Sequence, residues 1–227
     1  MNIGVLGSGI VAKTIAGKLA TLGHSVRLGT RDAKATLARN EPDMAGGPSI
    51  RVWLESRPTV KLTSFADAAA HGEIVVNALS GVGALPALAL AGEASLAGKV
   101  LLDISNPLDF SKGMPPSLTV ANTDSLGEQI QRAFPNTKVV KSLNTVNAFL
   151  MVDPGQLAGG DHTMFLCGND ASAKTEVTRI LKEWFGWKDI VDLGDLTNAR
   201  ATEMYVVLWA RLYGALQNPM FNVKLVR

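Results

Sequence analysis

The chain has 227 residues, enough for one large domain or for a ligand-binding domain with a smaller appendage. Its 22 lysines and arginines nearly balance its 20 aspartates and glutamates, so the formal net charge is only +2. Nucleic-acid binding usually needs a basic stripe, and we expect no nucleic-acid partner. The charge-free stretch from Ser80 to Gly92 is well short of the roughly 20 residues that cross a bilayer, so we expect no membrane segment.

The cysteine and histidine content argues against a metal site. The single cysteine, Cys167, lies in an apolar run and is typical of a buried strand residue. His24, His71 and His162 each lie beside a turn and lack partners at ligand spacing, so we expect no metal. A strand is predicted to begin at Asn2, which leaves no room for a secretory leader, and we therefore expect a cytoplasmic protein.

The first predicted unit is an apolar strand over residues 3–6, a glycine-rich turn and a helix. The turn reads Gly7-Ser8-Gly9-Ile10-Val11-Ala12. Placed between a strand and a helix, this pattern is typical of dinucleotide binding: Gly7 makes the tight turn, Gly9 lets the backbone approach a pyrophosphate, and Ala12 permits close packing. The helix N-terminus would attract the phosphates, so we expect residues 7–11 to contact a dinucleotide.

The second predicted strand, over residues 25–28, indicates which dinucleotide is bound. The strand closes on Gly29, Thr30 and Arg31. An NAD site usually carries an acid at this point, against the ribose 2′-hydroxyl. Arg31 can pair with a 2′-phosphate bidentately, the Thr30 hydroxyl adds a donor, and Lys34 adds positive charge one turn later. The sequence therefore predicts NADP(H). The alternative is that Arg31 and Lys34 merely begin a solvated helix.

The remaining strands complete an α/β fold. Strands are predicted over 59–62, 74–79, 100–104 and 138–142, with a helix over 126–134 and a polar, Gly- and Pro-containing stretch from 40 to 58. Strands so apolar on both faces belong in a parallel sheet with helices on each side. We predict a doubly wound parallel Rossmann sheet with a small, mainly helical C-terminal extension.

The boundary is placed after Val146, with a dinucleotide-binding domain over 1–146 and an extension for the acceptor site and dimerisation over 147–227. The extension is predicted to hold strands at 163–167 and 189–193 and helices at 172–185 and 196–216. The last helix is apolar around most of its circumference, through Met204, Val206, Val207, Leu208, Trp209, Leu212, Tyr213 and Leu216. We expect it to form a homodimer contact, the alternative being burial in its own core. Its charges would then lie at the interface or the rim of the site: Arg200, Glu203 and Arg211.

Three loops at strand carboxyl ends should face the dinucleotide, at 80–83, 105–108 and 143–146. They supply amide and hydroxyl groups that suit hydrogen bonds to a nicotinamide and a ribose: Ser80, Ser105, Asn106, Asn144, Thr145 and Asn147. Leu79, at the end of the preceding strand, is assigned to the same site. The alternative is ordinary turn chemistry.

Four motifs resemble those of a known family: Gly7-Ser8-Gly9, Gly29-Thr30-Arg31, Asp103-Ile104-Ser105-Asn106-Pro107-Leu108 and Lys141-Ser142-Leu143-Asn144-Thr145. Through them the chain, up to about Ala148, resembles the NADPH-dependent deazaflavin (coenzyme F420) reductases and the related NADPH-binding domain of the STEAP metalloreductases. The resemblance implies that Asn106, Pro107, Asn144 and Thr145 border the nicotinamide. It also implies that the two reacting rings stack against Val146 and Ala148.

Hydride transfer between two flat cofactors needs stacking and orientation more than acid–base chemistry. We therefore assign no catalytic acid or base and expect Asn144 to position the nicotinamide. The predicted activity is hydride transfer between NADP(H) and a deazaflavin such as coenzyme F420, or a flavin-like acceptor. The last third departs from the family's ending, which leaves open an imine or pyrroline-carboxylate reductase, or a non-catalytic NADP-binding redox sensor.

Overall fold

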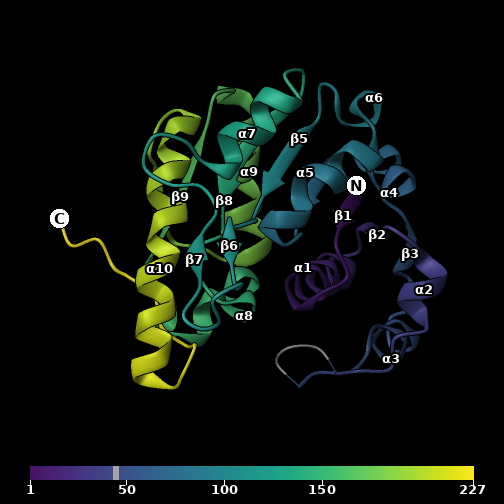
Figure 1. The fold of residues 1–227 in the computed structure, drawn as a ribbon, viewed down its shortest axis with the longest axis horizontal. Coiled ribbons are helices and arrows are strands. Elements are labelled where there is room, and N and C mark those ends of the chain that lie inside the picture. The colour runs from purple at the N-terminus through teal and green to yellow at the C-terminus, as the bar shows by residue number, and fades with distance from the viewer. Residues whose placement is uncertain (43–45) are drawn as a thin grey trace.

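A computed structural model describes residues 1–42 and 46–227 (Figure 1). Its main sheet has eight strands in the order β10-β9-β8-β5-β4-β1-β2-β3. Their bounds are Asn2–Leu6 (β1), Ser25–Thr30 (β2), Lys61–Ser64 (β3), Ile74–Asn77 (β4), Val100–Asp103 (β5), Lys138–Ser142 (β8), Thr163–Gly168 (β9) and Asp189–Asp192 (β10). A separate two-stranded hairpin pairs Leu108–Asp109 (β6) with Ser117–Leu118 (β7). The predicted α/β sheet is confirmed.

Helices cover both faces of the main sheet. Their bounds are Ile10–Thr21 (α1), Ala33–Leu37 (α2), Ile50–Glu55 (α3), Phe65–His71 (α4), Gly81–Ala91 (α5), Glu93–Leu96 (α6), Leu126–Ala133 (α7), Ala148–Val152 (α8), Ala171–Arg179 (α9) and Ala199–Leu216 (α10). One apolar cluster joins the sheet to α1, α3, α8 and α9, and a second joins it to α4, α5, α6 and α7. None of the helices in the described ranges is long and apolar enough to cross a membrane.

Side chains that alternate along each strand contribute to these two apolar clusters in turn. In β1, Ile3 and Val5 are buried in the first cluster, and Leu6 is buried in the second. In β4, Val76 points into the first cluster and Val75 into the second. Successive side chains of a strand point to opposite faces, so a strand between two helical layers must be apolar at nearly every position.

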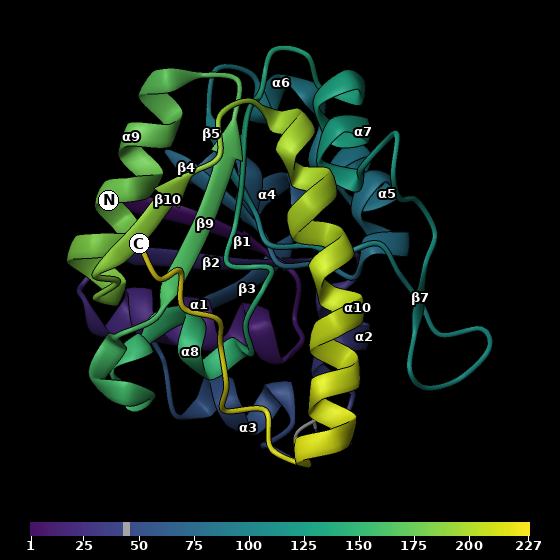
Figure 2. The ribbon, with the colours of Figure 1, turned by 90° about the vertical axis from the view of Figure 1, so that its left-hand side faces the viewer.

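The two strands of the C-terminal part extend the same sheet. β9 pairs antiparallel with β8, and β10 pairs parallel with β9, so the sheet is mostly but not wholly parallel. The helix predicted over 172–185 is α9 followed by a π-helical turn over Ile180–Phe185. The tail after α10 returns along β9, where Thr163 N donates to Val223 O at 2.9 Å (Figure 2).

Helices occur in the predicted loop at 80–83 and in the polar stretch from 40 to 58. Helix α5 begins at Gly81, so residues 81–83 form its first turn and only Ser80 precedes it. Gly81 is needed there because a Cβ would lie 2.1 Å from the Asn106 carbonyl oxygen, a tertiary contact that local sequence does not reveal. Helix α3 lies within the polar stretch 40–58, of which residues 43–45 are outside the described part of the chain.

Candidate functional site

A cavity of about 780 Å³ lies at the carboxyl edge of the parallel strands. The strand order reverses between β1 and β4, and this switch point is where dinucleotides bind in open α/β sheets. Many of the predicted cofactor residues line the cavity together: Ile10, Val11, Leu79, Ser80, Ser105, Asn106, Asn144, Thr145, Val146 and Ala148. The three strand-end segments therefore converge as the sequence predicts.

The glycine-rich turn has the geometry that a pyrophosphate requires. Gly7 has a φ of +129°, and a Cβ there would lie 2.7 Å from the Ala78 carbonyl oxygen. A Cβ at Gly9 would meet no protein atom within 4 Å, so open space lies beside the backbone. Ala12 is fully buried where α1 meets the sheet. No side chain caps the N-terminus of α1, which leaves its first N–H groups available to an anion.

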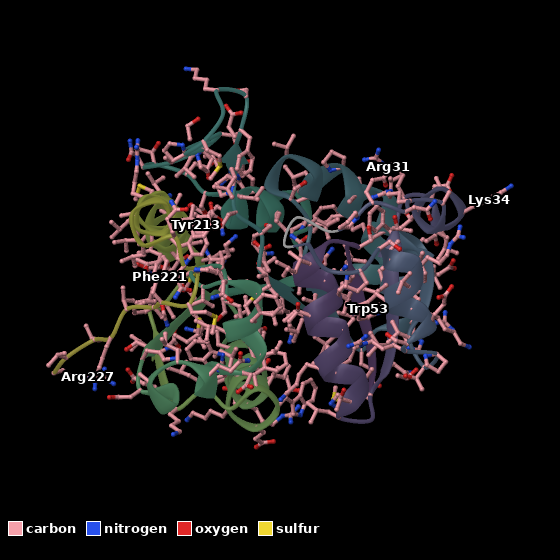
Figure 3. All side chains as sticks on the ribbon, turned by 90° about the horizontal axis from the view of Figure 1, so that it is seen from below. Arg31, Lys34, Trp53, Tyr213, Phe221 and Arg227 are labelled. Atoms are coloured by element: carbon pink, nitrogen blue, oxygen red, sulfur yellow. The ribbon has the colours of Figure 1, made fainter. Side chains whose placement is uncertain are left out.

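The end of β2 presents Arg31 to solvent. Arg31 and Lys34 are both exposed, and Figure 3 shows them on the same side of the molecule, with Lys34 projecting outward. The neighbouring acid, Asp32, caps α2 by accepting a hydrogen bond from Ala35 N at 2.9 Å. Thr30 is buried, and its hydroxyl lies 2.8 Å from that of Thr36. Arg31 and Lys34 are thus open to a ligand, whereas the Thr30 hydroxyl is engaged within the chain.

Asn106 and Asn144 hold two of the loops together. Asn106 Nδ2 donates to the Asn144 backbone oxygen at 2.8 Å, and Asn144 Nδ2 donates to Asn106 Oδ1 at 2.9 Å. Within the described residues, Asn144 Oδ1 and Thr145 Oγ1 are buried without a hydrogen-bond partner. An unpaired buried polar group costs about 1–3 kcal/mol, so these two oxygens suit a ligand such as a carboxamide.

Other predicted polar residues make bonds within the chain. Ser105 Oγ donates to Asp103 Oδ1 at 2.6 Å. Asn147 caps α8 by accepting from Phe149 N, and its Nδ2 donates to the Pro219 carbonyl, which anchors the C-terminal tail. Pro107 does not line the cavity; its carbonyl accepts from Thr119 N at 2.8 Å.

Helix α10 forms an apolar wall of the cavity. Val206, Trp209 and Tyr213 of this helix line it, together with Pro219. The Trp209 ring stacks 5.6 Å from Tyr213 and 5.4 Å from Phe221, and the last two are labelled in Figure 3. Sequence reasoning attributed the apolar surface of α10 to dimerisation and missed this role. The signal was the spacing of two aromatic residues by four, which places them on one helical face.

Behind the cavity lies a fully buried charge cluster. Lys141 Nζ lies 2.8 Å from Asp103 Oδ2, 2.8 Å from Glu203 Oε1 and 2.5 Å from the Ser105 carbonyl oxygen. Burial alone would lower the pKa of Lys141, but the two carboxylates outweigh it and hold the pKa above its ordinary value. Lys141 is therefore charged and joins β5, β8 and α10.

Glu203 is not an interface or rim charge, as the sequence suggested. It is 1% exposed, because its carboxylate accepts hydrogen bonds from Leu126 N and Gly127 N at the start of α7 as well as pairing with Lys141. Arg200 is also engaged within the chain, with its guanidinium on the Glu128 carboxylate.

Cys167 is confirmed as a buried strand residue. It lies in β9 and is inaccessible to solvent. Burial raises the pKa of its thiol to about 12, so the thiolate needed for nucleophilic chemistry is not formed near neutral pH.

The chain is similar in sequence to known oxidoreductases. Residues 2–107 match the family described as NADP oxidoreductase, coenzyme F420-dependent. The metalloreductase STEAP3 of Rattus norvegicus is 28% identical over 89% of this chain and 36% of that protein. The human metalloreductase STEAP2 is 25% identical over 89% of this chain and 35% of that protein. The chain therefore spans about a third of the length of these curated relatives.

Solved structures give a full-length match. A candidate F420-dependent NADP reductase from Arthrobacter sp. FB24 is 58% identical over 100% of both chains, with a TM-score of 0.96. A reductive aminase from Aspergillus terreus is 14% identical over 95% of this chain and 62% of its own, and its TM-score of 0.60 shows a shared fold alone. With the full-length match and the family match over residues 2–107, this chain belongs to the coenzyme F420-dependent NADP oxidoreductases.

Proposed function

We propose that this protein transfers a hydride between NADP(H) and a flat deazaflavin or flavin-like acceptor. The observation that carries the proposal is the cavity of about 780 Å³, which runs from the N-terminus of α1 to the apolar wall of α10. One end offers backbone N–H groups and amides to a dinucleotide, and the other offers apolar and aromatic surface to a second ring.

We assign the cofactor half of the site to the glycine-rich turn, Arg31 and the two asparagines, Asn106 and Asn144. Gly7 and Gly9 admit the pyrophosphate, Arg31 pairs with the 2′-phosphate, and Asn144 Oδ1 accepts from the nicotinamide amide. Asn106 fixes the orientation of Asn144 through their two hydrogen bonds. These contacts would hold the nicotinamide in one orientation.

The acceptor half is assigned to Val146, Ala148 and the α10 wall. NADPH supplies the hydride, which passes directly to the acceptor ring, and solvent supplies any accompanying proton. The residues exclude water and align the two rings, and holding two reactants in the right geometry can supply about 7–11 kcal/mol of the barrier reduction. Small side chains at Val146 and Ala148 leave room for the second ring to stack on the first.

The direct test is to incubate the protein with NADPH and, separately, coenzyme F420, flavin mononucleotide and a cyclic imine, and to follow absorbance at the nicotinamide band. Oxidation of NADPH by F420 or the flavin supports the proposal. Oxidation by the imine alone would support an imine reductase. Tight NADPH binding without turnover of any acceptor would support a redox sensor.

Replacing Arg31 with alanine should remove most of the preference for NADPH over NADH. We expect the unmodified protein to prefer NADPH at least about tenfold, because an Arg–phosphate pair contributes more than about 1.4 kcal/mol. Dissociation constants for both dinucleotides measure this, with Lys112→Ala, an exposed residue outside the cavity, as control. Equal affinity for NADH and NADPH in the unmodified protein would contradict the assignment.

We also propose that the protein is a homodimer through the outer face of α10. Leu208 is 52% exposed and Leu216 is 56% exposed on that helix. Light scattering at micromolar concentration should therefore give twice the chain mass, and Leu208→Glu with Leu216→Glu should give a monomer that still binds NADPH. A monomeric unmodified chain would refute the proposal. Point changes are preferable to truncation, because deleting α10 would leave Lys141 without Glu203.

A further inference from the structure

A second cavity, of about 470 Å³, opens beside the first one. It is a groove along the outer face of α1, between α3 and α8, and we call it the α1 groove. Ile10 and Phe149 line both cavities, so the groove continues from the proposed acceptor site. Phe149 is 46% exposed at this junction, and Figure 3 shows Trp53 beside α1.

Cationic side chains line the α1 groove. Among the described residues, its lining includes Lys13, Lys18 and Arg57 and one carboxylate, Asp153. Asp153 Oδ2 accepts a hydrogen bond from Gln156 Nε2 at 3.1 Å. Lys13 is 4% exposed, and its Nζ is held by the Pro48 carbonyl at 2.7 Å. Lys18 and Arg57 are therefore the cations of the described lining that bear on ligand binding.

The Arg57 guanidinium is held in place. It lies 4.7 Å from the centre of the Trp53 ring, and Trp53 is itself buried. Gly17, in the middle of α1, permits this arrangement, because a Cβ there would lie 3.2 Å from Arg57 Nε and 3.4 Å from Trp53 Cζ2.

Lys18 and Arg57 form no ion pair with the part of the chain that the structure describes. Within residues 1–42 and 46–227, every ion pair lies elsewhere, and no carboxylate is within 4.0 Å of either cation. Both side chains are half-buried, where charge is screened less than at a fully exposed site. An anion bound in the groove would supply the missing charge.

We propose that the α1 groove binds an anionic extension, a phosphate or carboxylate, of the acceptor whose ring lies in the neighbouring cavity. This inference rests on the proposed function. The dinucleotide's own anions are already assigned to the N-terminus of α1 and to Arg31, which does not line the groove. Lys18 lies eight residues after Ile10, about 12 Å along the helix axis, so the extension must be of that reach.

Riboflavin and flavin mononucleotide test this directly, because they share one ring and differ by a phosphate. With the unmodified protein, KM for flavin mononucleotide should be at least about tenfold below that for riboflavin. In the double variant Lys18→Gln, Arg57→Gln the two KM values should approach each other, while KM for riboflavin and the Kd for NADPH stay unchanged. Arg51→Gln is the matched control, since Arg51 lies on α3 but outside the groove.

Binding without turnover gives a second readout. Calorimetric titration of both flavins into the NADP⁺-bound protein should show the same phosphate-dependent advantage, reduced at high salt. Equal affinity for both flavins, or an unchanged advantage in the double variant, would overturn the inference alone. A loss of NADPH affinity in that variant would also overturn it, because the groove would then serve the dinucleotide. Failure of both flavins to bind would overturn the inference, and failure of every deazaflavin and flavin acceptor would overturn the proposed function as well.

Discussion

Replacing Ala148 with tryptophan is expected to lower acceptor turnover at least about a hundredfold, because misplacing a reacting ring by about 1 Å has an effect of this size. Ala148 is 8% exposed and lines the main cavity at the start of α8. An indole there would occupy the space assigned to the acceptor ring. NADPH affinity should stay within a few-fold, since the proposed dinucleotide contacts of Gly7, Gly9 and Arg31 lie on the other half of the site.

Steady-state kinetics with a saturating acceptor and a separate NADPH titration measure the two effects of Ala148→Trp. Ala94→Trp, on the exposed surface of α6, introduces the same side chain outside the cavity and away from α10, and should leave both quantities unchanged. If the Ala148 variant reduces the acceptor at the original rate, the acceptor ring does not lie at this position. An imine reductase or a non-catalytic binder would then be the better interpretation.

Replacing Lys141 with methionine is expected to lower the free energy of unfolding by about 3–5 kcal/mol, because it leaves the buried carboxylates of Asp103 and Glu203 without their cation. All three side chains are at most 1% exposed, so water cannot replace the lost partner. Urea unfolding measures the change. Lys138→Met is the control on the same strand, because its ion pair with Asp170 is partly open to solvent, at 37% and 34% side-chain exposure, and such pairs contribute about 0–1 kcal/mol.

A second variant separates charge from packing. Adding Glu203→Leu to Lys141→Met removes one of the two stranded carboxylates and should recover part of the lost stability, although the N–H groups of Leu126 and Gly127 then lose their acceptor. Equal stability of Lys141→Met and the unmodified protein would show that the cluster is not a buried ion pair. Lys141 also donates to the Ser105 carbonyl, so its loss should disturb the loop at 105–108 before global unfolding.

Local patterns predicted much of this molecule. Strand β8 has the predicted bounds Lys138–Ser142, and the other strands of the main sheet differ from prediction by at most a few residues. The hairpin of β6 and β7 was not predicted. Strands buried on both faces are apolar throughout, so they can be predicted from the sequence without tertiary information. The glycine-rich turn can be predicted in the same way, because only glycine readily takes the φ of +129° that Gly7 adopts. The meeting of three loops follows from the rule that parallel strands end at one edge.

Contacts between distant segments decided the rest. The sequence shows that α10 is apolar, but only the tertiary structure shows that Trp209 faces a cavity while Leu208 faces solvent. Glu203 looks like any helix-surface acid, yet it is buried because Lys141, 62 residues earlier in the chain, and the start of α7 converge on it. Periodicity reports which face of an element is apolar, and it carries no information about which distant charge lies opposite a given position. The α1 groove is hidden for the same reason, because Lys18 and Arg57 become neighbours only when α1 packs beside α3.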